Sequence, residues 1–447
     1  MSLFHRVWQR LLNLTPFQLA SLIFLIGLVI RLVLLFVSHG YRAPDPTELE
    51  RTAISLATTG VYGNPYLRPT GPTAHVAPGY TLILALIFRI FGTGLRGGIV
   101  QGVVACVTSS LLWALLPSAS RWIFGTNRPG ILAGLTGAIV VARPLVEIKG
   151  DWEAPYTAIA LVLLTMATVR LWRRQDLNGK LSAGHGLLWG VSLLFVPALL
   201  ALFAAFVIAG VFFFSRERVK RYLAFVVIEA SIVALCLAPW VVRNYYALGS
   251  PVVTRTNLGL ELRLSNNDAA SPDQRVNLLN NLFQRYHPLQ NKNEAFKVRA
   301  MGEVAYNKQA RAEAMQWIRT HPVRFVQLCI GRARCYWFYN DPTSTLKTVF
   351  LAVVNVLGFA GFYFVVRRNP AAATAIGLIL LIYPLPNYLV HVGLRQEFPL
   401  QPLMMMLAAV CVFCVFRPNK QLADFAAIPR PGQEVTVAGS GFSSVTG

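Results

Sequence analysis

Apolar runs of membrane-spanning length recur along the chain, and most charged residues lie in the segments between them. A helix that crosses the hydrocarbon core of a bilayer needs about 20 mainly apolar residues. Single spanning helices are predicted at 17–37, 98–117, 130–146, 154–171, 222–240, 346–366, 371–389 and 397–416. The pattern therefore predicts an all-α polytopic membrane helix bundle.

Two further apolar stretches are not single spans. Residues 187–214 are too long for one helix, contain Pro197 near the middle and have basic segments on both sides, so a hairpin of two short spans is predicted. Residues 80–91 form a run of only about a dozen residues, and a crossing there would place Arg121 outside the membrane. That run is predicted to be re-entrant or interfacial, which gives about ten spans with both ends of the chain in the cytoplasm.

The composition supports a membrane protein. Hydrophobic residues make up 55% of the chain and charged residues 13%, whereas soluble domains carry about a quarter charged residues. The net charge of +22 would suit a nucleic-acid-binding protein, but the basic residues cluster between the apolar runs, where they set topology and contact anionic lipids. The expected partners therefore include membrane lipids and exclude nucleic acid.

The six cysteines suggest no disulfide framework. Cys411 and Cys414 form a CxxC pair, but it lies in a run of Val and Phe without a neighbouring His or acid. The pair is interpreted as two small buried hydrophobic residues. No metal and no cofactor is assigned from the sequence.

The predicted topology divides the chain into four parts. These are a transmembrane module with an acidic first outer loop at 1–240, an outer segment at 241–345, C-terminal transmembrane helices at 346–416 and a disordered cytoplasmic tail at 417–447. The outer segment is predicted to contain one helix from about Asn293 to Arg319 and a second helix beginning at Pro322, since proline suits a first helical position.

The first outer loop carries three acids, Asp45, Glu48 and Glu50, close to the end of the first span. The amphipathic pattern that follows predicts a short interfacial helix opened by Glu48, with Asp45 just before it. A carboxylate held at the membrane boundary could act as a general base, and compensation of helix-end charge is an equally good explanation. Glu50 is interpreted as a solvated neighbour.

A second acidic cluster, Glu147–Glu153, lies between two predicted spans on the same side of the membrane. Two acidic clusters on one face suggest one site. Asp151 and Glu153 are therefore candidates for substrate binding, and a purely structural role remains open for both. Lys149 among these acids is expected to form a surface ion pair of little energetic value.

Basic residues occupy the same predicted side. Arg243 stands beside Asn244 at the exit of a spanning run, and Arg395 lies at the start of the last one. Arginine is the preferred side chain for bidentate phosphate contact, although a boundary arginine is usually a topological anchor. Together with His75, these residues are predicted to line a cationic pocket for a lipid phosphate.

Four segments in order resemble a known superfamily. They are the Asp45, Glu48, Leu49 group followed by Ala53, Leu56 and Gly60, then GPTAHVAPGYTLILALIFRIFG, APWVVRNYYALGSPVVTRTNLGLELRLSNN and HPVRFVQLCIGRARCYWF. This order resembles the bacterial GT-C glycosyltransferases, the superfamily of protein O-mannosyltransferases and aminoarabinose lipid A transferases.

The resemblance implies a function. Such enzymes transfer a sugar, with inversion, from a polyprenyl-phosphate donor to a lipid, glycan or protein acceptor on the non-cytoplasmic face, here of a bacterial inner membrane. It implies that Asp45 is the general base, with Glu48 beside it, and that Arg243 and Arg395 contact the carrier phosphate. No cofactor is implied, because arginines can stabilise a phosphate leaving group.

Two other classes remain open. A secondary transporter predicts ionisable residues within the spans and repeated halves, whereas the predicted spans are nearly free of acids apart from Glu229 and no repeat is visible. A polymerase or ligase for surface polysaccharide would also use a large outer segment. The position of the acids directly after the first span favours the transferase.

Overall fold

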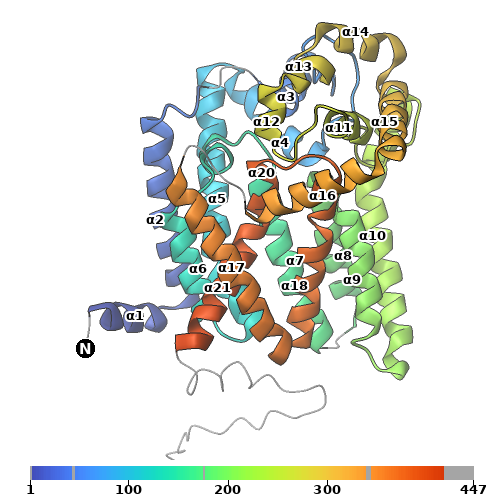
Figure 1. Ribbon diagram of the computed structural model, residues 1–447. Helices are drawn as coiled ribbons and strands as arrows, with labels where there is room; N and C mark the ends of the chain where they lie inside the picture. The colour runs from blue at the N-terminus through green and yellow to red at the C-terminus, as the bar shows by residue number, and fades with distance from the viewer. Residues whose placement is uncertain (1–2, 43–45, 175–176, 339–343, 417–447) are drawn as a thin grey trace, which may run out of the picture.

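The computed structural model describes residues 3–42, 46–174, 177–338 and 344–416. Two predictions fall outside these ranges: the role of Asp45 and the disordered tail at 417–447. The described chain is all α, as predicted, with isolated bridges but no strand. Figure 1 shows long helices side by side and shorter helices gathered at one end.

Seven helical segments of the described chain are long and apolar enough to cross a membrane. They are α2 (Pro16–Val37), α5 (Leu95–Phe124), α7 (Ala154–Arg174), α10 (Arg216–Leu248), α17 (Thr345–Arg368), α18 with α19 (Pro370–Ile382 and Leu385–Leu389), and α20, η2 and α21 (Leu394–Glu397, Phe398–Leu400 and Gln401–Phe416). Three shorter helices belong to the same bundle: α6 (Arg128–Ile139), α8 (Gly179–Phe195) and α9 (Leu199–Val211). In chain order these ten segments correspond to the ten predicted spans.

The hairpin predicted at 187–214 is present as α8 and α9, and the break between them contains Pro197. Its first helix begins earlier than predicted, at Gly179. The reason is a cap, because the Asn178 side chain accepts a hydrogen bond of 2.8 Å from the Leu181 N–H.

Two helices lie outside the set of spans. Helix α4 (Pro78–Phe91) is no shorter than α6 or α9, but it lies beside α3 (Glu48–Thr59) at one end of the bundle (Figure 1) and packs on it through an apolar cluster that includes Leu49, Ala53 and Leu84. Helix α1 (Leu3–Asn13), which the apolar runs did not reveal, lies across the end of the bundle opposite these two helices (Figure 1).

Short helices form a layer over one end of the bundle, which we call the cap (Figure 1). The cap contains α3, α11 (Leu258–Ser265), α12 (Gln274–Leu279), α13 (Leu282–Tyr286), α14 (Lys292–Met301) and α15 (Glu303–Thr320), and α16 (Pro322–Trp337) returns from it to the bundle. The single helix predicted from Asn293 to Arg319 is wrong, because Gly302, at φ +83°, separates α14 from α15. The predicted start at Pro322 is confirmed.

A buried ion pair joins α2 to the short helix η1 (Leu145–Lys149), which lies between α6 and α7. The Arg31 guanidinium on α2 donates to the Glu147 carboxylate and, at 2.8 Å, to the Gly137 carbonyl. Both charged side chains are fully buried, and a buried charge without a partner would be strongly destabilising. Glu147 therefore points into the bundle and pairs with Arg31, so it does not act as part of the acidic cluster predicted at Glu147–Glu153.

A second buried pair lies close by in the chain. Arg143 Nη2 donates to Glu397 Oε2 at 2.7 Å, and Asn355 also contacts that carboxylate. This pair joins the segment after α6 to α20. Two residues near the start of the 143–153 segment are thus held, Glu147 by α2 and Arg143 by the start of the last span.

Candidate functional site

A cavity of about 610 Å³ lies where the membrane helices meet the cap. Its lining comes from the start of α7, the α8–α9 turn, the segment leading into α11 and the region around α19 and α20. We call it the boundary cavity. The polar lining residues are Glu153, Thr157, Thr254, Arg255, Asn257, Glu261, Asn387, His391, Arg395 and Gln396, and the apolar ones include Ala198, Ile382, Leu385 and Pro386.

Of the two arginines in this lining, Arg395 has fewer hydrogen-bond partners among the described residues. Its guanidinium carbon lies 3.3 Å from the ring centroid of Trp152, so the planar group stacks on the indole. Its buried Nη1 has no hydrogen-bond partner among the described residues. A partly buried guanidinium with an unpaired donor is a ready site for an oxyanion.

Arg255 supplies a second cation from the segment before α11. Its Nη2 donates to Glu153 Oε1 at 3.1 Å, and both side chains are partly exposed. The Arg255 Nε has no partner among the residues that the structure covers. Glu153 therefore lines the cavity, where the sequence predicted substrate binding, but it does so as the partner of an arginine.

His391 and Glu261 face each other across the cavity wall. His391 Nδ1 lies 3.3 Å from Glu261 Oε2. Burial, together with the nearby Arg395, lowers the pKa of His391 to about 3, so the ring is neutral at physiological pH. Burial also raises the pKa of Glu261 above its usual value.

The two acids at the start of α3, Glu48 and Glu50, have different environments. Thr47 caps the helix, and Glu48 opens it, as predicted. The Glu50 carboxylate accepts hydrogen bonds from the Thr47 N–H at 2.8 Å and from Gln101 Nε2 at 2.7 Å. Glu50 is only 4% exposed, so the interpretation of a solvated neighbour is wrong.

Asp151 lies on the loop between η1 (Leu145–Lys149) and α7. Its Oδ2 is 3.5 Å from Lys149 Nζ, while Oδ1 is buried without a hydrogen-bond partner in the described chain. Burial and the neighbouring Glu50 raise the pKa of Asp151 to about 6, and Lys149 opposes that rise. The two acidic segments thus meet in space, through Glu50 and Asp151.

Arg243 and Asn244 have a different environment from the one predicted. Arg243 donates to the carbonyls of Thr73 at 2.6 Å and Tyr62 at 2.5 Å, and also to the Asn244 side chain. Asn244 in turn donates to the Val252 carbonyl at 2.8 Å. Neither residue lines the boundary cavity. These bonds brace the first loop against α10, and the phosphate contact of Arg243 stays a prediction.

His75 lies outside the cavity lining, in a buried group with Tyr66 and His287. Burial and the nearby His287 lower the pKa of His75 well below its usual value. Sequence reasoning missed His287, and it also missed Arg255 and Glu261 in the cavity wall. Each of these lies in a polar stretch where no local pattern distinguishes it from its neighbours, so only the tertiary structure identifies them.

The structure thus combines a bundle of membrane helices, a helical cap and, between them, a cavity lined by two arginines and two glutamates. Solved structures with a similar fold include those of the oligosaccharyltransferase AglB of Archaeoglobus fulgidus. Its apo form superposes with a TM-score of 0.53 at 14% identity, covering 94% of this chain and 53% of that chain. The form tethered to an acceptor peptide with the NVT sequon gives 0.52 at 16% identity, with coverage of 92% and 51%.

A third AglB structure, a complex with an inhibitory peptide and a dolichol-phosphate, gives a TM-score of 0.51 at 15% identity and covers 93% of this chain and 51% of that chain. The protein thus spans about half the length of AglB. No family model and no curated protein sequence matches it. At this level of identity the likeness shows the fold alone.

Proposed function

We propose that this protein is an integral-membrane glycosyltransferase that moves a sugar from a polyprenyl-phosphate donor to a lipid, glycan or protein acceptor. The observation that carries the proposal is Arg395, a stacked guanidinium with an unpaired buried Nη1 in the wall of the boundary cavity. The departing phosphate of such a donor carries negative charge, which a preorganised arginine stabilises.

The wall of the cavity suits a lipid-linked phosphate in a second way. Ile382 and Leu385 come from a membrane helix, whereas Arg255 and Glu261 come from the segment before α11 and from α11 itself. An amphiphile could keep its chain against the first pair and its headgroup against the second. The complex of AglB with a dolichol-phosphate supports a donor of this class.

The catalytic base is proposed from the sequence. Asp45 holds that role by its resemblance to the superfamily, and Glu48, at the start of α3, stands three residues further on. The base deprotonates the acceptor as it attacks, and the sugar is transferred with inversion. We place this chemistry on the non-cytoplasmic face of a bacterial inner membrane, on the side of the cap.

The test uses purified full-length protein, labelled polyprenyl-phosphate sugars and a panel of peptide, glycan and lipid acceptors. Asp45→Asn should abolish turnover while donor binding persists. The matched control is Asp268→Asn, at an exposed residue that is not part of the cavity lining. Undiminished turnover by Asp45→Asn would remove the base assignment, and solute uptake by proteoliposomes without any transfer would favour a secondary transporter.

A further inference from the structure

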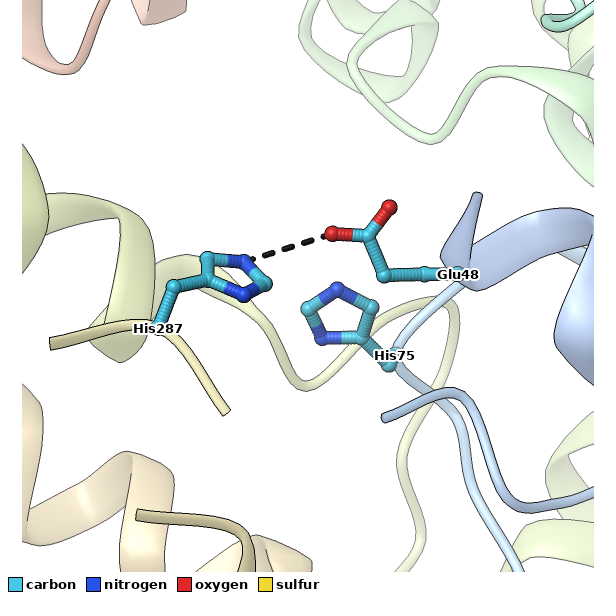
Figure 2. A group of neighbouring side chains, drawn as sticks. All are labelled: Glu48, His75 and His287. Atoms are coloured by element: carbon cyan, nitrogen blue, oxygen red, sulfur yellow. Dashed lines mark ion pairs between the residues drawn. The ribbon is translucent and has the colours of Figure 1, made fainter. Parts of the chain in front are cut away.

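Three potential metal ligands from distant parts of the sequence meet inside the cap. They are Glu48 at the start of α3, His75 in the loop before α4, and His287 directly after α13. One ligand atom from each lies within 4.8 Å of the others, and Figure 2 shows the three side chains converging. The two histidines are buried, and the Glu48 side chain is 13% exposed. The group is therefore largely shielded from solvent, with slight access at Glu48.

The rings are oriented so that their Nε2 atoms face the carboxylate (Figure 2). The Tyr66 hydroxyl lies 2.9 Å from His75 Nδ1, which leaves Nε2 of that ring free to bind another group. His287 Nε2 is 3.4 Å from Glu48 Oε1. That separation is long for an N–H···O hydrogen bond, whose usual length is about 2.9 Å.

The same separation suits a shared cation. Ligands that bind zinc at about 2.0–2.1 Å in a tetrahedron lie about 3.3 Å from one another. His287 Nε2 and Glu48 Oε1 already have this spacing, and a modest movement of the His75 ring would complete three corners.

We propose that Glu48, His75 and His287 bind a zinc ion. Two imidazoles and one carboxylate are a donor set that zinc uses when it keeps its fourth position open. The site would join α3, the loop before α4 and the segment after α13, and so hold the first loop against the cap. It revises the expectation of no metal, and it does not depend on the proposed transferase activity.

One contact limits the affinity. The Leu289 N–H donates to His287 Nδ1 at 3.1 Å, and a ring that binds zinc through Nε2 needs its proton on Nδ1. Zinc binding must therefore break the Leu289 contact. The site is expected to hold zinc more weakly than a closed site of cysteines, which makes competition with a chelator the right measurement.

The site also lies close to the boundary cavity. Phe283 stacks on His287 with ring centroids 5.6 Å apart, and its other neighbour is His391, at 6.4 Å. His391 belongs to the cavity wall. The Phe283 ring therefore connects the proposed zinc site to the cavity wall, so that a displacement of His287 can shift His391.

The experiment measures zinc itself. Full-length protein without a histidine tag is stripped with a chelator and titrated with zinc against a fluorescent competitor, and bound metal is counted by mass spectrometry. Wild type should bind one zinc per chain. His287→Ala, His75→Gln and Glu48→Gln should each weaken binding at least about tenfold. His321→Ala, at an exposed histidine stacked on Trp317, is the matched control and should bind as wild type does.

Thermal unfolding separates loss of the site from loss of the fold. Zinc should raise the unfolding temperature of wild type and of His321→Ala, and leave that of the stripped His287→Ala protein unchanged. Zinc binding by His287→Ala with wild-type affinity, or no binding by wild type, would overturn the proposal. Because His75→Gln can still hydrogen-bond to Tyr66, it tests the ligand role even if an alanine variant fails to fold.

Discussion

Arg395 stacks on Trp152, with the guanidinium carbon 3.3 Å from the ring centroid. Trp152 comes from the loop before α7 and Arg395 from α20, so the contact joins two segments that are distant in the sequence but both line the boundary cavity. Stacking fixes the plane of the guanidinium while its N–H donors stay available. An arginine held in this way can bind an anion with little loss of side-chain entropy.

This relationship predicts a strict requirement for arginine. Arg395→Lys keeps the charge but loses the stacked plane and the paired donors, so affinity for a polyprenyl phosphate should fall about tenfold or more, since a hydrogen bond to a charged group contributes about 1.5–3 kcal/mol. Binding of the lipid phosphate to purified protein measures this. Arg299→Lys, at an exposed residue of α14, should bind normally. Equal affinities for the two variants would exclude Arg395 as a phosphate contact.

Arg243 should behave differently, because its guanidinium is used by the carbonyls of Thr73 and Tyr62. Arg243→Lys cannot make both bonds together, so it should destabilise the protein by about 2 kcal/mol. Thermal unfolding in detergent should show this loss, while donor binding at low temperature changes little. A variant with normal unfolding but weakened donor binding would instead support the phosphate contact predicted from the sequence.

Local patterns predicted the features that depend on neighbouring residues. Apolar runs gave the order of the helices, since crossing a membrane requires length and hydrophobicity. Pro322 marked a helix start because its fixed φ and missing N–H suit that position. Glu48 was placed at the start of a helix by the amphipathic pattern behind it, and Thr47 supplies the cap.

Features that depend on tertiary partners could not be predicted in this way. Glu50 has the composition of a surface acid, but Gln101 from α5 provides the hydrogen bond that permits its burial. Glu147 likewise required Arg31, which lies 116 residues earlier in the chain. Gly302 could have been tolerated within a helix, and its positive φ became visible only with the structure.

The Arg31–Glu147 pair should be a main determinant of stability. Glu147→Ala leaves a buried arginine without its counter-charge and should cost about 3–5 kcal/mol. The double variant Arg31→Met with Glu147→Leu should recover only part of that loss, because the carbonyls of Gly137 and Ala138 also lose their donor. Unfolding temperatures of the three proteins measure the effect.

The control is an ion pair whose lysine is exposed and whose glutamate keeps a second partner, Arg263, when the lysine is replaced. Lys297 contacts Glu294 at 2.7 Å but is 59% exposed in its side chain. Lys297→Met should therefore change stability by less than about 1 kcal/mol. If Glu147→Ala were as mild as Lys297→Met, the buried ion pair would not be a determinant of stability.

Asp151 gives the protein a pH dependence of definite sign. In the folded protein its pKa is raised to about 6 by burial and by Glu50, whereas an unfolded chain loses this proton near pH 4. Between those values the folded state binds more protons than the unfolded state, so stability falls as the pH rises through this window and is level above it. The side chain of Asp151→Asn cannot ionise, so the stability of this variant relative to wild type should increase across the window, by at most about 3 kcal/mol.

Unfolding temperatures measured from pH 4 to pH 8 test this prediction, with Asp268→Asn as the control, whose unfolding temperature should change with pH as that of wild type does. An advantage of Asp151→Asn that is the same at every pH would mean that Asp151 does not titrate in this range.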